Sequence, residues 1–267
     1  MVPMTSNFMA ATDRAAIITQ LRAAGCVWAE DEADLLISAA STPAHLQSIL
    51  ARRVDGEPLE HILGWASFSG IRVMIAPGVF VPRARTGLLV RAASTLVDHR
   101  DAVVLDLCCG SGAISAAVAA KAPGTLQVYA SDVDAAAVAC ARLNLRPWGG
   151  QVYQGDLFAA LPAHLRGSVD ILVANVPYVP TAQIGMLPRE ARLFEPHLSL
   201  DGGADGLDLL RRLATEVPSW LAPRGHFIVE TSQAQSPTAA EVLHRAGLAA
   251  RVVTDAQLDA TAIIATR

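Results

Sequence analysis

The fold of this chain is set by the stretch Val103-Val104-Leu105-Asp106-Leu107-Cys108-Cys109-Gly110-Ser111-Gly112. Its first five residues are mostly apolar and predict a buried strand, and the alanine-rich segment 113–121 predicts a helix. Between them, glycines let the backbone pass close to a ligand, and the helix start offers free N–H groups. A glycine turn alone is a weak sign of a binding site, because tight strand-to-helix connections are common.

The segments that follow alternate between apolar strands and helices. This alternation predicts an α/β fold with a mostly parallel sheet that is covered by helices on both faces. Ligands of such sheets bind at the carboxyl ends of the strands, so the chemistry should lie just after each strand. The predicted strands are Val103–Leu107, Gln127–Ser131, Gln151–Gln154, Val169–Ala174 and His226–Glu230, with 251–253 and 262–265 closing the sheet, and the predicted helices are Ala113–Lys121, Ala135–Leu145, Leu207–Leu221 and Thr238–Ala246.

The chain before this α/β part follows a different pattern. Apolar residues from Asp13 to Arg53 recur at helical spacing and predict three short helices. Alternating stretches between Gly64 and Phe80 predict a β-hairpin, and Thr86–Val97 predicts a further helix. We therefore predict a small helical domain at 1–57, a β-hairpin connector at 58–83 and the main domain at 84–267.

The composition excludes several classes of protein. Of the 267 residues, 52% are hydrophobic and 17% are charged, so the chain can bury a large core and is not disordered. The mean hydropathy is +0.36, but the sequence has no run of about 18 uncharged apolar residues, which a membrane span requires. The net charge of −4 provides no bulk attraction to nucleic acid.

The termini and cysteines point to a cytoplasmic protein. Residues 1–11 lack the basic start and long apolar block of a secretory signal. The four cysteines are not spaced as a disulfide framework or a zinc site, so we expect reduced thiols and no metal.

Three acidic residues stand at the ends of successive strands. Asp132 follows the glycine turn by about 20 residues, where a carboxylate binds the hydroxyls of a ribose. Asp156 can accept from the amine of adenine, with Leu157 against the ring, and Asp106 can orient the turn or bind an ammonium group. Ribose, adenine and an amino-acid tail together describe S-adenosylmethionine, whereas NAD has no such tail. Each acid alone is more often a helix cap or a turn residue.

The fourth predicted strand runs into Asn175-Val176-Pro177-Tyr178. The Asn175 amide offers an acceptor oxygen, and Val176, which precedes a proline, is held extended, so its carbonyl is fixed in direction. Two such acceptors would bind both hydrogens of an –NH₂ group and turn its lone pair toward a methyl donor, with Tyr178 as a flat face. Positioning of this kind can recover about 7–11 kcal/mol. The simpler interpretation is a strand-ending turn with proline for rigidity and tyrosine for packing.

Three further motifs flank these sites: Pro58-Leu59-Glu60-His61-Ile62-Leu63-Gly64, Pro77-Gly78-Val79-Phe80-Val81-Pro82-Arg83 and Glu195-Pro196-His197-Leu198-Ser199-Leu200-Asp201-Gly202-Gly203-Ala204-Asp205-Gly206-Leu207. Together with the segment 175–178, they resemble the motifs of the HemK/PrmC family of protein-(glutamine-N5) methyltransferases, which carries Asn-Pro-Pro-Tyr after its fourth strand. The resemblance covers roughly residues 55–246.

The resemblance implies a class I S-adenosylmethionine-dependent methyltransferase fold with a Rossmann-like seven-stranded sheet, and N-terminal helices that recognise the substrate. It implies a glutamine of a partner protein as acceptor; the family's best-known substrates are the Gly-Gly-Gln loops of peptide chain release factors. No membrane or nucleic-acid partner is expected. The cofactor should contact Asp106, Cys108, Cys109, Gly110, Ser111, Gly112, Asp132, Val133, Asp156, Leu157 and Asn175, while Asn175, Pro177 and Tyr178 are the expected catalytic residues and Val176 also binds the acceptor.

The chain departs from the family pattern at four places, one of which is that the family's Gly-Arg-Asp near the C-terminus is absent between Asp255 and Ile263. Val176 replaces the first proline of the Asn-Pro-Pro-Tyr motif, and Cys108 replaces the first glycine of the turn. The family's Pro-Arg-Pro-Glu-Thr-Glu becomes Pro82-Arg83-Ala84-Arg85-Thr86-Gly87, which exchanges an acid for a base at position 85. These departures are similar to those of a divergent actinobacterial branch related to the release factor methyltransferases.

Two alternatives stay open on the sequence alone. A nucleic-acid adenine-N6 methyltransferase uses the same motif geometry on an exocyclic amine, but it must flip a base, and the negative net charge disfavours it. A non-catalytic module that binds S-adenosylmethionine is the other, and the intact Asn175, Pro177 and Tyr178 disfavour it.

Overall fold

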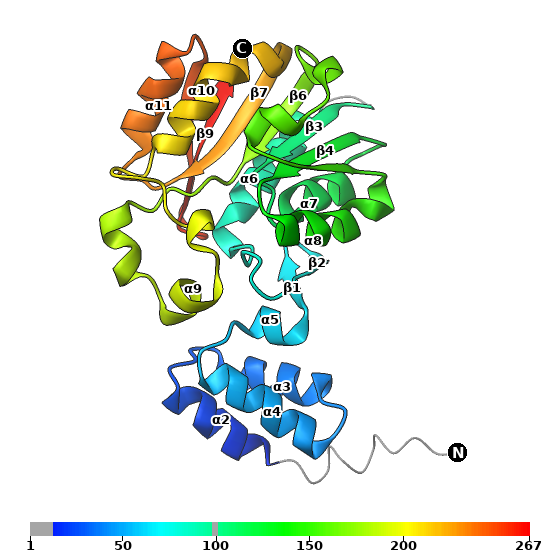
Figure 1. Ribbon diagram of the computed structural model, residues 1–267, viewed down its shortest axis with the longest axis vertical. Helices are drawn as coiled ribbons and strands as arrows, with labels where there is room; N and C mark the ends of the chain where they lie inside the picture. Colours follow the sequence, from blue (N-terminus) through cyan, green and yellow to red (C-terminus); the bar gives the residue numbers. More distant parts are fainter. Residues whose placement is uncertain (1–12, 98–100) are drawn as a thin grey trace.

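The structure, a computed structural model, describes residues 13–97 and 101–267. The first 12 residues of the predicted helical domain at 1–57 lie outside the described residues. Figure 1 shows two parts: a group of short helices at the N-terminal end and a larger α/β part that holds the sheet. Within the described part of the chain, no helix is long and apolar enough to cross a membrane.

The three predicted N-terminal helices are confirmed as α2 (Arg14–Ala23), α3 (Ala29–Ala39) and α4 (Pro43–Val54). The Thr42 hydroxyl caps α4 by accepting from the backbone N–H of His45 at 3.1 Å, and Pro43 supplies the preset φ of a first turn. Their apolar faces form a core of their own, separate from the sheet. That core contains Ile17, Leu21, Ala29, Ala33, Leu36, Ile37, Leu46, Ile49 and Leu50.

A short helix that the sequence pattern did not predict, α5 (Leu59–Leu63), lies at the start of the predicted connector. It ends at Gly64, whose φ of +78° is left-handed and suits glycine. The predicted hairpin follows as antiparallel β1 (Trp65–Phe68) and β2 (Ile71–Met74). Asn144 fastens it to the main domain, because its side chain bonds both the N–H and the carbonyl of Met74, at 2.8 and 2.9 Å.

The main domain is built on a seven-stranded sheet in the order β5-β4-β3-β6-β7-β9-β8. The strands from β5 to β7 are parallel, while β9 runs antiparallel to both of its neighbours. This confirms the predicted mostly parallel sheet. The strands are β3 (Val103–Leu107), β4 (Gln127–Asp132), β5 (Gln151–Gln154), β6 (Val169–Ala174), β7 (Leu221–Thr231), β8 (Ala249–Asp255) and β9 (Ala260–Thr266).

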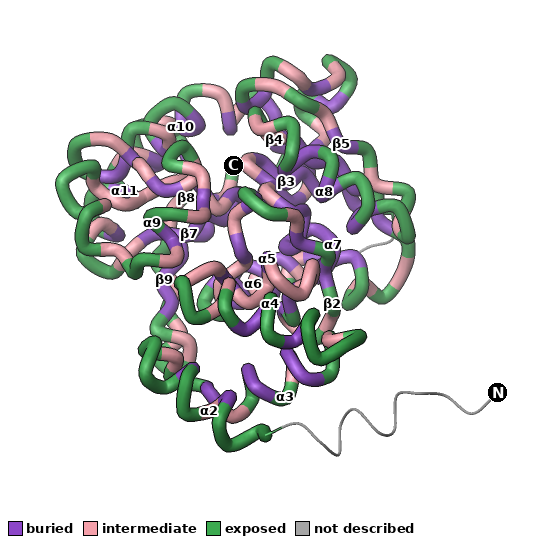
Figure 2. Tube along the Cα trace, turned by 60° about the horizontal axis from the view of Figure 1, so that its bottom comes forward, coloured by how far each residue is buried: buried purple, intermediate pink, exposed green. Residues whose placement is uncertain are grey.

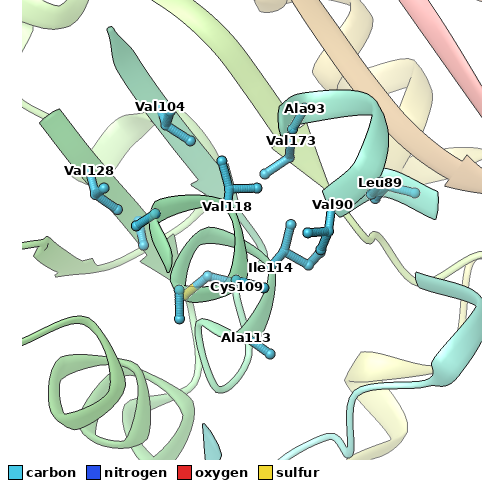
Figure 3. Packing of buried hydrophobic residues seen from close by; sticks show 14 of the residues in the cluster. Leu89, Val90, Ala93, Val104, Cys109, Ala113, Ile114, Val118, Val128 and Val173 are labelled. Atoms are coloured by element: carbon cyan, nitrogen blue, oxygen red, sulfur yellow. The ribbon is translucent and has the colours of Figure 1, made fainter. Parts of the chain in front are cut away.

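Helices cover both faces of the sheet, because neighbouring strand residues point to opposite sides. Val104, Val128 and Val173 pack toward α7 and α6 on one face (Figure 3). Leu105 and Leu172 pack into the cluster that contains α10 and α11 on the other face. Figure 2 shows the central strands buried inside, with helices around them that are buried on one side and exposed on the other. The helices are α6 (Gly87–Leu96), α7 (Ala113–Lys121), α8 (Ala135–Leu145), α10 (Asp208–Trp220) and α11 (Ser236–Arg245).

The main difference from the predicted elements lies around Leu221. The helix predicted to end there stops at Trp220, and Leu221 begins β7 instead of ending a helix. The reason is tertiary, since Leu221 pairs with Val169 of β6 and is fully buried. A second unpredicted helix, α9 (Arg189–Phe194), interrupts the long connection after β6.

Candidate active site

One large cavity of about 940 Å³ opens at the carboxyl ends of β3, β4, β5 and β6. This is the edge where a parallel sheet binds its ligands, and it is the edge that the sequence analysis selected. Two more segments wall the cavity: the connector around Phe80–Thr86 and the loop that carries α9. The predicted site residues that line it are Cys108, Cys109, Gly110, Ser111, Asp132, Val133, Asp156, Leu157, Asn175, Val176, Pro177 and Tyr178.

The glycine turn after β3 is held against the end of β4. The N–H of Cys109 donates to the carbonyl of Ser131 at 3.1 Å, and the N–H of Gly110 donates to Oδ2 of Asp132 at 2.8 Å. Gly110 has a φ of +53° and Cys108 a φ of +54°. Cys108 therefore adopts the left-handed conformation that glycine would take without strain.

Two of the predicted cofactor residues do not line the cavity. Gly112 lies at the start of α7, where a Cβ would come within 3.1 Å of the Cβ of Ala141, so this glycine serves the packing of α7 on α8. Asp106 is fully buried behind the turn, with its Oδ2 accepting from the N–H of Ser115 at 3.1 Å. Its Oδ1 has no hydrogen-bond partner within the described residues. Burial raises the pKa of the Asp106 carboxyl to about 7.

The two remaining acids stand at the cofactor end of the cavity. Asp132 ends β4, and its Oδ1 accepts from the N–H of Asp134 at 2.9 Å. Burial raises the pKa of the Asp132 carboxyl, because the charged form loses hydration there. Asp156 is far more exposed and pairs with Arg212 of α10 at 2.6 Å. Arg212 also lines the cavity, although it was not among the predicted site residues.

The acceptor end is built around Asn175. Its Nδ2 donates to the hydroxyl of Thr86 at 3.3 Å, which leaves the carbonyl oxygen Oδ1 to accept from a ligand. Thr86 is buried at the start of α6, and the sequence analysis had not singled it out. Thr86 could have been predicted as a site residue because it follows the motif residues Pro82-Arg83 closely in the sequence.

Tyr178 is held at both ends. Its carbonyl accepts from Nε2 of Gln235 at 2.8 Å, and its hydroxyl donates to Oε1 of Glu230 at 2.8 Å. Beneath it, Gly206 approaches so closely that a Cβ there would overlap the carbonyl oxygen of Tyr178. Glu230 was also missed, although it lies at the end of a predicted strand, where the same rule had identified the other acids.

The loop with α9 connects the cavity to the N-terminal helices. Glu190 lines the cavity and pairs with Arg53 of α4 at 3.2 Å, and Arg189 donates to the carbonyl of Asp55 at 2.6 Å. At its other end, Glu195 pairs with Arg83 of the connector at 2.6 Å. Figure 1 shows α9 on this loop between the sheet and the helical part.

The residues at the cofactor end fit S-adenosylmethionine. Asp132 can accept from ribose hydroxyls and Asp156 from the adenine amine. Behind the turn, Oδ1 of Asp106 is a buried acceptor without a partner among the described residues. An acidic environment of this kind suits a ligand that carries a sulfonium and an ammonium group. Among the described residues, no group of three or more His, Cys, Asp or Glu side chains is arranged to hold a metal ion. All four cysteines are free thiols.

Comparisons with known proteins agree with this geometry. The family model described as "Methyltransferase small domain" matches residues 70–187. A release factor glutamine methyltransferase of Geobacter sulfurreducens is 36% identical over 206 residues, which is 76% of this chain and 71% of that protein. One from Streptomyces coelicolor is 38% identical over 195 residues, or 72% of this chain and 69% of that protein.

Solved structures share the fold. A ribosomal protein L11 methylase from Lactobacillus delbrueckii subsp. bulgaricus superposes with a TM-score of 0.52 at 16% identity, covering 72% of this chain and 83% of that one. The T. thermophilus 16S rRNA N2 G1207 methyltransferase superposes with a TM-score of 0.53 at 20% identity, covering 76% of this chain and 49% of that one. At these identities, the likeness establishes the class I methyltransferase fold alone.

Proposed function

Because the chain belongs to the family of release factor glutamine methyltransferases, we propose that its substrate is a peptide chain release factor. The enzyme transfers the methyl group of S-adenosylmethionine to the side-chain amide nitrogen of a glutamine. The proposal of a release factor rests on the names of relatives at 36% and 38% identity over most of their length.

The acceptor end of the cavity supports this chemistry. A glutamine amide nitrogen is a poor nucleophile because its lone pair is delocalised into the carbonyl. We propose that Oδ1 of Asn175 and the carbonyl of Val176 accept the two amide hydrogens, which would turn the lone pair toward the methyl donor. Thr86 supports this arrangement, since it binds Nδ2 of Asn175 and so determines which side of that amide faces the cavity.

At the other end of the cavity, we propose that the glycine turn and the acidic residues bind the cofactor. We propose that Asp132 binds the ribose and that Asp156 and Leu157 bind the adenine, with Cys108–Ser111 and Val133 against the rest of the cofactor. When bound, S-adenosylmethionine supplies a methyl group on a positively charged sulfur. The chain's own residues contribute orientation and the exclusion of water.

The proposed activity also suggests a role for each part of the chain. We propose that the helical domain at 1–57 recognises the substrate, with 58–83 as connector and 84–267 as the methyltransferase domain. The α9 loop supports this division, because it touches the helical domain through Arg53 and lines the cavity through Glu190. Release factors act on cytoplasmic ribosomes, so we propose the cytoplasm as the location.

A single observation carries the proposal: the cofactor acids and the segment Asn175–Tyr178 line the same cavity. To test it, the purified protein is incubated with S-adenosylmethionine labelled in the methyl group, and separate reactions contain unmethylated release factor, a cell lysate or nucleic acid. Labelled peptides are identified by mass spectrometry, and Asn175→Ala serves as the inactive control.

The expected result is one methylated glutamine in the release factor, absent with Asn175→Ala. Label on a different protein of a cell lysate would contradict the release factor but leave glutamine methylation intact. Label at N6 of adenine in nucleic acid would favour the competing activity.

A further inference from the structure

A buried carboxylate lies beside the acceptor motif and has no role in the proposed chemistry so far. Glu230 is close to the carboxyl end of β7, next to β6, and its side chain is only 3% exposed. Oε1 accepts from the Tyr178 hydroxyl at 2.8 Å and from Nε of Arg85 at 3.3 Å. Oε2 is buried and has no partner within the described residues.

A carboxylate in such a place is costly for stability. Burying a charge requires several kcal/mol, and apolar side chains of similar size are often as stable or more so. Likewise, the ring of Tyr178 would pack without its hydroxyl if packing were its only task. Stability and packing therefore do not account for the Glu230 carboxylate and the Tyr178 hydroxyl, and we attribute both groups to the orientation of the Tyr178 ring.

The contacts determine that orientation. Gln235 binds the backbone carbonyl of Tyr178, and Glu230 binds the hydroxyl at the far end of the ring. With both ends held, the ring cannot swing about its side-chain bonds. Burial and the charge of Glu230 raise the pKa of Tyr178, so the hydroxyl stays protonated and remains a donor.

Arg85 supplies the positive charge that this carboxylate needs. It lines the cavity, pairs with Glu230, and its guanidinium carbon lies 5.9 Å from the centre of the Tyr178 ring. Position 85 is also where this chain has a base in place of the acid of the Pro-Arg-Pro-Glu-Thr-Glu motif. The ion pair is thus a feature that the family motif does not contain.

We propose that Glu230 and Arg85 are positioning residues that hold the Tyr178 ring in the orientation needed against the acceptor amide. The proposal rests on the proposed function, because it takes the pocket beside Asn175 to be the glutamine site. Positioning matters here, since a displacement of about 1 Å in a reacting group can cost about 100-fold in rate.

The kinetic test compares the full-length wild type with Glu230→Gln, Arg85→Ala, Arg85→Lys and Tyr178→Phe, using release factor and S-adenosylmethionine. Glu230→Gln and Arg85→Ala should lower kcat about 10- to 100-fold, with the Kd for S-adenosylmethionine unchanged. Arg85→Lys should recover part of the loss. Arg245→Ala, which breaks an exposed ion pair with Glu241 far along the chain on α11, should leave kcat unchanged.

A double-mutant cycle separates positioning from general damage. If Glu230 acts through the Tyr178 hydroxyl, Glu230→Gln should cost little more in the Tyr178→Phe background. If Glu230→Gln lowers kcat by the same factor in the Tyr178→Phe background as in the wild type, the proposal is overturned.

A measurement without turnover separates this inference from the proposed function. The chain has three tyrosines, so the protein labelled with 3-fluorotyrosine should give few ¹⁹F resonances, and Tyr178→Phe identifies one of them. Glu230→Gln and Arg85→Ala should shift or broaden the Tyr178 resonance and leave those of Tyr129 and Tyr153 in place. An unchanged Tyr178 resonance contradicts the positioning role. A shifted resonance in a protein that fails to methylate release factor contradicts only the substrate.

Discussion

Cys108 occupies a backbone conformation that side chains rarely adopt. Its φ is +54°, in the turn that faces the cofactor end of the cavity. A left-handed conformation costs a residue with a Cβ about 1–2 kcal/mol. The chain therefore tolerates strain at the position where the family has a glycine.

We predict that Cys108→Gly stabilises the protein by up to about 1 kcal/mol, since the relief of strain exceeds the entropy that glycine adds to the unfolded chain. Cys109→Gly is the matched control. Cys109 has a negative φ and packs in the buried cluster of Figure 3, so this variant should be destabilised. Denaturant unfolding gives both values, and a clear loss of stability in Cys108→Gly would falsify the strain argument.

The second residue-scale prediction concerns Asp106. Its folded pKa is about 7, whereas an unfolded Asp titrates near pH 3.9. The folded state thus holds the proton more tightly, and the stability that this provides at acid pH is lost as the pH rises through about 7.

Asp106→Asn removes this titration. Relative to the wild type, the variant should gain unfolding free energy between pH 5 and 7, on the order of 1 kcal/mol per pH unit. Unfolding free energies are measured across this range without cofactor. Parallel pH profiles of the two proteins would show that Asp106 is not the titrating group.

At the scale of elements, the acceptor motif depends on the glycine-rich segment that passes under it. The N–H of Gly202 donates to the carbonyl of Val179 at 2.9 Å, and Gly206 packs against the backbone of Tyr178. Both contacts hold the segment after β6 in place. The acceptor end is therefore formed by two segments of chain, of which only the first carries the motif.

We predict that Gly206→Ala lowers kcat about 10- to 100-fold, because the added Cβ overlaps the Tyr178 carbonyl and Nε2 of Gln235. Gly247→Ala is the control. Its φ of +83° is close to the +80° of Gly206, but a Cβ there meets nothing within 4 Å. Both variants should lose stability through backbone strain, and only Gly206→Ala should lose activity. Equal kcat values in the two variants would exclude a steric effect on the site.

At the scale of the whole molecule, the cavity lies where three parts meet. The sheet edge provides the cofactor end, and the segment Phe80–Thr86 at the end of the connector and the start of the main domain provides a second wall. The α9 loop joins the cavity wall to the helical domain through Arg53. Arg53 is itself tied to Glu32 of α3 at 2.6 Å, and both side chains are only 11% exposed. A single ion pair, Arg53–Glu190, would thus connect a protein substrate that docks on the helices to the cavity wall.

Cofactor binding should stabilise the whole molecule. At 100 times its Kd, S-adenosylmethionine should add about 2.7 kcal/mol, which for a protein of this size raises Tm by about 5–10 °C. Thermal unfolding with and without the cofactor measures this shift. Asp132→Asn should show a smaller shift at the same concentration, and an equal shift would show that the Asp132 carboxylate does not bind the cofactor.

The sequence by itself determined most of the strands and helices and the end of the sheet at which the site lies. Continuous apolar runs such as Ile171–Ala174 predict buried strands, because a strand covered on both faces has no polar side. The rule that ligands bind at strand ends then selected Asp132, Asp156 and Asn175, all of which line the cavity. The positions of these residues could be predicted because the ends of strands follow from local periodicity and from neighbours in the chain.

Only the tertiary structure decided how these residues are held. Thr86 meets Asn175 across 89 positions of sequence, and Arg85 meets Glu230 across 145. Distant contacts also explain two features that the sequence did not predict. Leu221 joins β7 because Val169 lies beside it, and Asp106 and Gly112 lie behind the cavity wall, in contact with α7 and α8. Contacts between distant segments arise from burial and strand register, so local sequence patterns do not predict them.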